Sequence, residues 1–270
     1  MTDCTFSGNN ASSNGGAIWN GSSNIMTDCT FSGNNASTDG GAILNNSSNI
    51  VTDCTFSNNA SSNGGAIWNS SSNIMTDCTF SGNNASSNGG AILNNSSNIM
   101  TDCTFSNNAS SSGGAIYIYA DNDNVKNCSF KNNTPTNLYV DGTYSGTVTN
   151  CYWGTDTPTT SDYGTISNYT VTNNATSKTV YNIIKYTKAS VTTGTNIPLI
   201  IKCLDCNGNP IPNMILTLKD GTNTLTTLTS DTNGLSTYTI TVTASMSLTI
   251  TNTATDNYNS CTSETRTITV

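Results

Sequence analysis

The chain has no histidine and few charged side chains, and these scarcities exclude whole classes of function. Of its 270 residues, 8 are lysine or arginine and 16 are acidic, which gives a formal net charge of −8. The first basic side chain is Lys126. Proteins bind nucleic acids through basic surfaces that neutralise phosphates, so this charge distribution argues against nucleic-acid binding. No apolar run approaches the ~20 residues of a membrane-spanning helix.

Apolar residues are also sparse, at 34% of the chain, while charged residues make up 9%. Intrinsically disordered chains usually combine low hydrophobicity with high charge, and this chain lacks the second property. Its Asn, Ser, Thr and Gly residues instead recur in a strict order, which indicates ordered stacking of repeats.

Seven cysteines mark the repeat, at intervals of 23 to 25 residues. They are Cys4, Cys29, Cys54, Cys78, Cys103, Cys128 and Cys151. Units that contain Gly8, Gly33 or Gly82 are one residue longer than the units that lack this glycine. Insertions are tolerated in turns, so we expect a turn after the Phe of each unit. Self-similarity at this period predicts a solenoid.

Composition selects the type of solenoid. The repeats contain almost no Glu, Lys, Arg or Gln, which argues against helical repeats. Segment 25–31 alternates in the manner of a half-buried strand. This alternation predicts that Ile25, Thr27, Cys29 and Phe31 face inward and that Met26, Asp28 and Thr30 face outward. Short strands joined by Asn/Ser/Gly turns predict a right-handed parallel β-helix with about 25 residues per coil.

Successive coils of such a helix lie ~4.8 Å apart, so each position of the repeat forms a ladder of like side chains. We expect stacked Phe rings in the core and stacked Asn amides that bond along the ladder and satisfy the turn backbone. Neighbouring cysteines would have parallel Cβ vectors, which is unsuitable for a disulfide. The seven cysteines are therefore predicted to be buried thiols.

The first residue occupies the repeat position of Met26, Met75 and Met100. The chain thus begins partway through a coil, without the cap that the end of a solenoid requires, and we expect it to be a piece of a longer protein. A missing secretory signal then says little about location.

Units of the form Cys-x-Phe-x-x-Asn-x-Ala followed by Gly-Gly-Ala-Ile resemble the repeats of polymorphic outer-membrane proteins and of adhesin-like proteins from methanogenic archaea. The matching residues are Phe6, Phe31, Phe56, Phe80, Phe105 and the Gly-Gly-Ala-Ile segments at 15–18, 40–43, 64–67, 89–92 and 113–116. The resemblance covers about residues 1–154 and implies a surface-exposed β-helix of the adhesin type, without a defined ligand.

The repeat pattern decays after residue 116, as expected for the closing coils of a solenoid. Trp153, with Tyr152, is our candidate for the lid of the core. We assign residues 1–154 to the β-helix and residues 155–177 to a linker.

Residues 178–270 contain seven short alternating segments separated by turn signals, which predicts an antiparallel β-sandwich. Segments 205–211 and 231–234, together with Tyr258, resemble bacterial Ig-like domains of the invasin type, and this resemblance implies a spacer. Cys206 and Cys261 are a possible disulfide pair if the compartment is oxidising.

The repeats lack the groups that catalysis on this scaffold requires. Glycosidases use paired carboxylates, yet residues 1–154 contain no Glu, His or Arg. The acids of the repeats form mainly one column, which consists of Asp3, Asp28, Asp53, Asp77 and Asp102. We interpret this column as solvated outer-face residues; recruitment of divalent cations is the alternative. We expect no enzymatic activity, no metal site and no cofactor.

Two further columns are candidate sites. One is an apolar stripe next to the inward Ile, formed by Trp19, Leu44, Trp68, Leu93 and Tyr117. It is either an outward binding face or a surface covered by neighbouring turns. The other is a column of Asn-x-Ser/Thr sequences, which are candidate glycosylation acceptors. Its members are Asn10, Asn35, Asn59, Asn84 and Asn108.

Together these features predict a non-catalytic adhesin or stalk at the cell surface, with the β-helix as a repetitive binding surface and the Ig-like domain as a spacer. Its expected partner is a glycan or protein on a host or neighbouring cell. The alternative is a polysaccharide-processing β-helix of the lyase or glycosidase kind. A third class, an ice-binding array on the threonine column that includes Thr5 and Thr30, is disfavoured by the adjacent Asp column.

Overall fold

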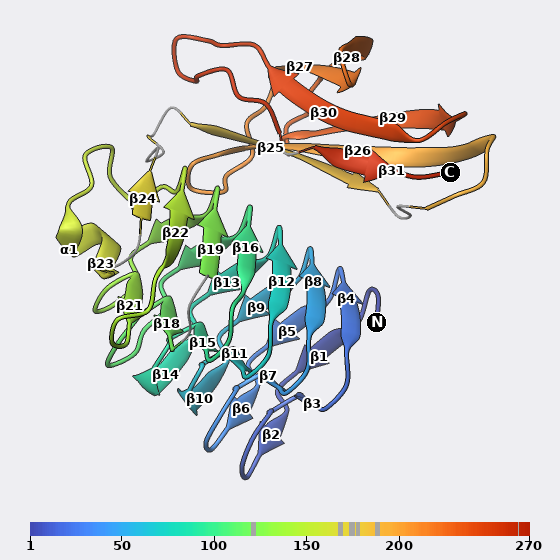
Figure 1. The fold of residues 1–270 in the computed structure, drawn as a ribbon. Helices are drawn as coiled ribbons and strands as arrows, with labels where there is room; N and C mark the ends of the chain where they lie inside the picture. Colours follow the sequence, from blue (N-terminus) through green and yellow to red (C-terminus); the bar gives the residue numbers. More distant parts are fainter. Residues whose placement is uncertain (120–122, 167–169, 173–175, 177–178, 187–189, 264) are drawn as a thin grey trace. The chain divides into compact units, whose positions relative to one another are not determined.

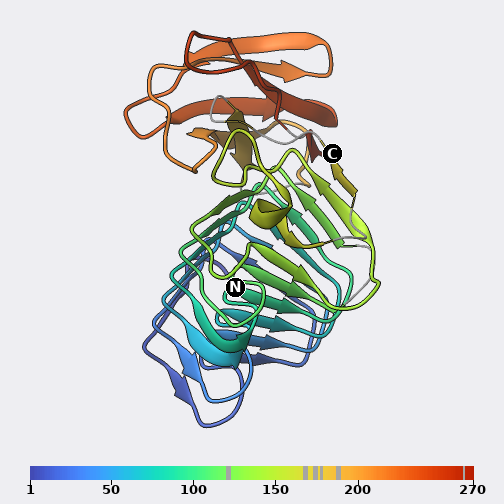
Figure 2. The same cartoon turned by 90° about the vertical axis from the view of Figure 1, so that its left-hand side faces the viewer.

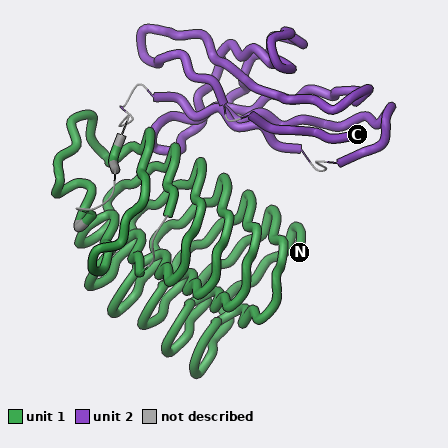
Figure 3. The backbone as a smooth tube through the Cα atoms, in the orientation of Figure 1, with its two compact units in different colours: residues 1–175 green, residues 176–270 purple. Residues whose placement is uncertain are grey.

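The computed structural model describes residues 1–119, 123–166, 170–172, 176, 179–186, 190–263 and 265–270. They form two compact units, residues 1–175 and residues 176–270 (Figure 3). Each unit is described by itself below.

The first unit is a stack of coils whose short strands line up into four parallel sheets (Figures 1 and 2). Sheet I contains β1 (Thr5–Ser7), β5 (Thr30–Ser32), β9 (Thr55–Ser57), β13 (Thr79–Ser81), β17 (Thr104–Ser106) and β20 (Ser129–Lys131). Sheet II contains β2 (Asn10–Ala11), β6 (Asn35–Ala36), β10 (Ala60–Asn63) and β14 (Asn84–Asn88). Sheet III contains β3 (Ile18–Asn20), β7 (Ile43–Asn45), β11 (Ile67–Asn69), β15 (Ile92–Asn94), β18 (Ile116–Ile118), β21 (Leu138–Val140) and β23 (Gly164–Thr165). Sheet IV contains β4 (Asn24–Thr27), β8 (Asn49–Thr52), β12 (Asn73–Thr76), β16 (Ile99–Thr101), β19 (Asp123–Lys126), β22 (Gly146–Thr149) and β24 (Thr170–Thr172). The predicted parallel β-helix is confirmed.

The Phe ladder is the clearest consequence of this register. Phe6 pairs with Phe31 across sheet I, and the same register continues to Phe130. Ring centroids are 4.8 to 5.1 Å apart and the planes deviate by at most 9°. All rings except Phe6 are fully buried. The ladder therefore buries large apolar side chains at constant spacing, as close packing requires.

The core is closed after the last coil of sheet I. Trp153 is buried and stacks on Phe130 with ring centroids 5.0 Å apart. Tyr163, the last residue of α1 (Thr160–Tyr163), meets Trp153 edge to face at 4.9 Å. This observation confirms Trp153 as a lid, and it adds Tyr163 to it.

The segment that we expected to be a linker, residues 155–177, contributes to the β-helix. It contains α1, and its strands β23 and β24 pair in parallel with β21 and β22. The segment lacks the repeat consensus, so its pairing was not visible in the sequence.

The predicted inward and outward directions of the side chains in segment 25–31 were wrong for Ile25 and Met26. Ile25 is 60% exposed, whereas Met26 is 1% exposed. Asp28 separates β4 from β5 in a left-handed conformation with φ of 53°. This residue resets the alternation, so that Cys29 and Phe31 still face the core. The equivalent aspartates of the following coils have φ between 53° and 58°.

Turns elsewhere in the coil follow the sequence expectation. The turn after each Phe has a glycine at φ of 61° to 63° in the longer units, and in the others Asn58, Asn107 or Asn132 replaces it at φ of 54° to 56°. Gly41 meets a different requirement, because a Cβ there would lie 2.1 Å from the carbonyl oxygen of Gly65. The Gly-Gly pair thus permits close approach of neighbouring coils.

The second unit consists of two antiparallel sheets, as expected of a β-sandwich. One contains β25 (Val180–Tyr186), β26 (Thr195–Asp205) and β29 (Leu235–Val242). The other contains β27 (Ile215–Asp220), β28 (Asn223–Thr229), β30 (Met246–Asn252) and β31 (Arg266–Ile268). Buried aliphatic side chains from both sheets form one core. Asn182 of β25 crosses this core and donates a 2.8 Å hydrogen bond to Asn252 of β30.

Candidate functional site

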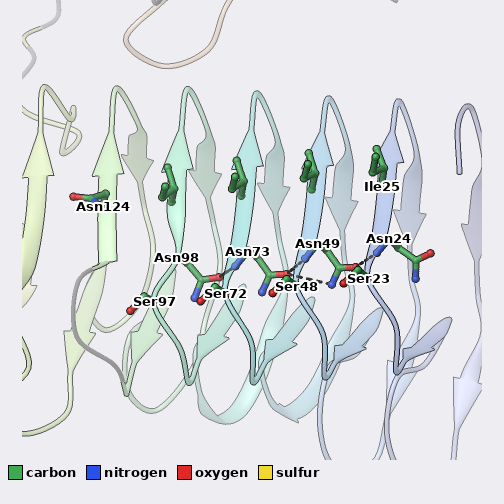
Figure 4. Close-up of a pocket in the computed structure, with 13 residues that line it drawn as sticks. Ser23, Asn24, Ile25, Ser48, Asn49, Ser72, Asn73, Ser97, Asn98 and Asn124 are labelled. Carbon is green, nitrogen blue, oxygen red and sulfur yellow. Dashed lines mark hydrogen bonds between the residues drawn. The ribbon is translucent and has the colours of Figure 1, made fainter. Parts of the chain in front are cut away.

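A groove of about 750 Å³ runs along the β-helix beside sheet IV (Figure 4). One wall is a row of outward isoleucines, and the other wall and the floor are rows of serine and asparagine. Its lining consists of Ser23, Asn24, Ile25, Ser48, Asn49, Ile50, Ser72, Asn73, Ile74, Ser97, Asn98, Ile99 and Asn124. Four successive coils thus contribute the same three side chains, one each of Ser, Asn and Ile.

The isoleucine row is an exposed apolar surface that repeats along the coils. Ile50, Ile74 and Ile99 are 42% to 44% exposed, and Ile25 at the first coil is more exposed. Pairing in sheet IV places each directly beside the next. In the following coil the row ends at Asn124, which pairs with Ile99. Contiguous exposed apolar rows are uncommon on soluble surfaces and mark binding sites.

A ladder of hydrogen-bonded Asn amides lies along the groove. The backbone N–H of Asn24 donates to the Oδ1 of Asn49 at 2.8 Å, and Asn49 bonds to Asn73 in the same way at 3.0 Å. Asn49 Nδ2 also donates to Asn45 Oδ1 in the adjacent ladder of sheet III. These amides satisfy one another, as predicted for stacked Asn, so the floor acts as a scaffold.

Asp123 ends this ladder with a carboxylate. It is fully buried and occupies the ladder position after Asn98. Its Oδ1 accepts the backbone N–H of Asn98 at 2.6 Å, and both carboxylate oxygens accept from Asn94 Nδ2. The next coil has Gly146 at this position and offers no side-chain acceptor. A carboxylate only accepts hydrogen bonds, which suits the last rung of a ladder.

The serine rim is the part of the groove with free hydrogen-bonding capacity. Ser23, Ser48 and Ser72 are exposed. Each hydroxyl has one long contact, of 3.2 to 3.4 Å, to a serine of the next coil. A hydroxyl has one donor and two acceptor positions, so each can also bond to a ligand.

None of the 13 residues that line the groove is ionisable, and the nearest carboxylate described, that of Asp123, is fully buried. The Asp column lies at the turn between sheets IV and I and is not part of the lining. Among the residues that the structure describes, no three His, Cys, Asp or Glu side chains come together as a cation site. Cation recruitment by the Asp column therefore has no geometric support.

The predicted apolar stripe is largely covered. Trp19 at the first coil is 61% exposed and Trp68 is half-buried, but Leu44 and Leu93 between and beside them are buried. Tyr117 is buried as well and stacks on Tyr139 at 4.9 Å. Burial, with a hydrogen bond to Tyr119, raises the pKa of Tyr117. The stripe does not form a continuous exposed surface, whereas the isoleucine row does.

The predicted glycosylation column was wrong in its alignment. Asn10, Asn35 and Asn84 are exposed in sheet II, but Asn59 and Asn108 are fully buried. Ala60, not Asn59, pairs with Asn35 and Asn84, because the unit of Asn59 lacks the turn glycine. Asn59 belongs to a second amide ladder, in which its Nδ2 bonds to the Phe31 carbonyl oxygen at 3.1 Å. An alignment of the repeats with a gap in place of the missing turn glycine would have shown that Asn59 is not equivalent to Asn35.

The cysteines are free thiols, and those of the β-helix after Cys4 are buried, as predicted. Burial raises the pKa of Cys78, Cys103 and Cys128 well above the ordinary thiol range. Cys206 and Cys261, which we named as a possible disulfide pair in an oxidising compartment, are free thiols in this structure. In the sandwich, burial raises the pKa of Cys203 to about 12, with a smaller contribution from the nearby Cys261.

Comparison with protein families agrees with this architecture. The model of the right-handed β-helix region matches residues 1–153, which is more than half of the chain. The chain belongs to the right-handed β-helix family. Within this β-helix protein, the matched region ends at the lid residue Trp153 and contains the whole groove. A comparison with curated proteins found no match. Among the described residues of the β-helix protein, no helix is long and apolar enough to cross a membrane.

Proposed function

We propose that the protein is a non-catalytic adhesin or stalk of the cell surface, in which the β-helix binds a glycan or protein of another cell and the sandwich acts as a spacer. The observation that carries this proposal is the neutral, repetitive groove of four coils, lined by Ser, Asn and Ile. Binding surfaces of this kind need no reactive group, and repeated coils supply the same contact several times.

The chemistry of the groove supports binding without turnover. Glycoside hydrolysis requires two carboxyl groups beside the scissile bond, and the groove has none. The chain also has no histidine to act as a general base near neutral pH. The resemblance of the repeats to adhesin-like proteins and of residues 178–270 to invasin-type domains adds to this interpretation.

A binding assay with a paired activity assay tests the proposal. Fluorescent protein is applied to immobilised surface glycans and to intact cells, and release of reducing sugar from soluble polysaccharides is followed in parallel. We expect saturable binding and no release of reducing sugar. Release of sugar that scales with protein concentration would contradict the proposal and favour the polysaccharide-processing alternative.

Two variants locate the binding surface in this assay. Ile50→Ser with Ile74→Ser removes the centre of the isoleucine row, whereas Trp19→Ala with Trp68→Ala removes the exposed part of the apolar stripe. We expect the first pair to reduce binding and the second to leave it nearly unchanged. The opposite result would move the binding surface to the stripe.

A further inference from the structure

The shape of the groove favours a slender ligand over a globular partner. It extends over the four coils from Ile25 to Ile99, three strand spacings or ~14 Å. A stable protein–protein interface buries about 800 Å² on each partner, with a large apolar centre. Four partly exposed isoleucines and a serine rim offer far less than this area. One extended chain lying in the groove would contact all of it.

The charge of the groove favours an uncharged ligand. Its lining carries no cation that could pair with a carboxylate, sulfate or phosphate. The whole chain has a net charge of −8, and the neighbouring Asp28 is exposed on the same coil as Ile25. Polyanions would therefore be repelled without any compensating ion pair.

The pattern of the walls favours a ligand that is apolar on one side and hydroxylated along the other. Each coil supplies one isoleucine side chain to the lining, and the serine two residues before it lies in a separate row (Figure 4). A pyranose ring has this combination, with C–H groups on its faces and hydroxyls at its edges. A linear glycan repeats the combination along its length, as the coils do.

We infer that the groove binds a single strand of an uncharged, linear polysaccharide that lies along the β-helix axis, with sugar faces on the isoleucine row and sugar hydroxyls bonded to Ser23, Ser48 and Ser72. This inference rests on the proposed function and specifies its ligand. The satisfied amide floor holds the site in shape before binding, which limits the ordering cost.

Affinity electrophoresis of the 270-residue chain tests the inference. The gels contain one soluble polymer each: mixed-linkage β-glucan, glucomannan, xylan, dextran, polygalacturonate or alginate. We expect retardation by at least one of the four neutral polymers and none by the two polyuronates. Retardation by polyuronates alone, or by none of the six polymers, would overturn the inference.

Titration with oligosaccharides of the retarding polymer tests the orientation. Affinity should rise with chain length until the ligand spans the four coils and then remain constant, because longer chains find no further isoleucine. An affinity that is already maximal for a disaccharide would contradict binding along the axis. An unbranched alcohol of similar length tests an acyl-type ligand, and equal affinity for it would overturn the glycan assignment.

Matched variants measure how much the isoleucine row and the serines each contribute to affinity, with a control for unspecific effects of surface substitutions. Ile50→Ser with Ile74→Ser should weaken binding at least about tenfold, because two apolar contacts are lost. Ser48→Ala with Ser72→Ala should weaken it about fivefold through lost hydrogen bonds, while an alcohol ligand would be insensitive to this change. Ile200→Ser with Ile215→Ser is the control, since these two exposed isoleucines belong to the other unit.

The outcomes distinguish this inference from the proposed function. If cells and glycan surfaces bind the Ile50/Ile74 variant as well as the parent, the adhesin proposal remains supported, but the inference that the ligand binds in the groove is wrong. If oligosaccharides bind in the groove and are cleaved, the assignment of the ligand stands and the non-catalytic proposal falls.

Discussion

The β-helix and the sandwich bury their apolar side chains through different kinds of packing. In the β-helix each core residue packs mainly on its own equivalent one coil away, as Phe56 does on Phe31 and Phe80. In the sandwich, unlike apolar residues from strands of two sheets share one core, as Leu199 of β26 and Ile250 of β30 do. Repetition gives the β-helix long ladders in which a change at one rung affects both neighbours. The sandwich distributes its contacts, so equivalent changes should remain local.

Raising the pH should produce the largest difference in stability between the two units. Burial raises the pKa of Cys78, Cys103 and Cys128, and the hydrogen bond to Cys78, together with burial, raises that of Cys54. A raised folded-state pKa gives stability that is complete below the ordinary thiol pKa of about 8.5 and is lost as the pH rises above it. Burial also raises the pKa of Cys29 and Tyr117, so five thiols and one phenol of the β-helix share this dependence. Among the described groups of the sandwich, burial raises the pKa of Cys203 and Tyr186. The β-helix should therefore lose stability a few times more steeply than the sandwich as the pH rises above about 9.

Tryptophan fluorescence under reducing conditions measures this difference, because all three tryptophans lie in the β-helix. The fluorescence transition should precede the loss of the remaining circular dichroism signal as the pH is raised. Cys78→Ala with Cys103→Ala should make this slope clearly shallower, because two of the buried thiols are then absent. Equal slopes for the two units would contradict the ladder explanation.

Truncation of one ring in the Phe ladder is the next largest effect. Phe56→Ala should destabilise the β-helix by about 3–5 kcal/mol, because it opens a cavity between two stacked rings. Phe6→Ala should cost only about 1–2 kcal/mol, since this half-buried ring stacks on one neighbour. Denaturant unfolding followed by tryptophan fluorescence gives both values. The sandwich transition, followed by circular dichroism, should not move, and a shared loss of stability would mean that the units unfold together.

Removal of one amide gives a smaller effect that shows the coupling directly. Asn59→Ala should cost about 2–3 kcal/mol, because the amide hydrogens of Asn34 lose their acceptor and the Phe31 carbonyl loses its donor. The exposed Asn35→Ala is the control and should cost less than about 0.5 kcal/mol. In a double-mutant cycle, Asn59→Ala and Asn83→Ala should couple by about 0.5–3 kcal/mol, because they share a hydrogen bond. Asn59→Ala and Asn252→Ala, which lie in different units, should be additive.

Most of the fold could be predicted because the repeat places equivalent residues in register. The Phe and Cys ladders, the Asn ladders, the lid at Trp153 and the seven sandwich strands follow from periodicity and turn signals alone. The pairing of β23 and β24 could not be predicted, because that last segment has lost the consensus and pairs through its backbone.

The site was less predictable, and single residues account for this. One left-handed residue, Asp28, turns Ile25 outward and Met26 inward, and simple alternation cannot reveal such a reset. A missing turn glycine moves Asn59 from the surface into a buried ladder. The apolar stripe failed as a continuous surface because its smaller leucines are buried beside larger aromatic neighbours. The directions of Ile25 and Met26 could have been predicted by treating each Asp of the column as a turn. The burial of Asn59 could have been predicted by aligning the repeats with a gap where the turn glycine is missing.

The near-identity of successive coils also has a hereditary consequence. Excision or duplication of one whole unit joins two coils whose Phe, Cys and Asn rungs already match, so no new complementarity has to evolve at the junction. The number of rungs, and with it the length of the groove, can therefore change in discrete steps while the architecture stays the same.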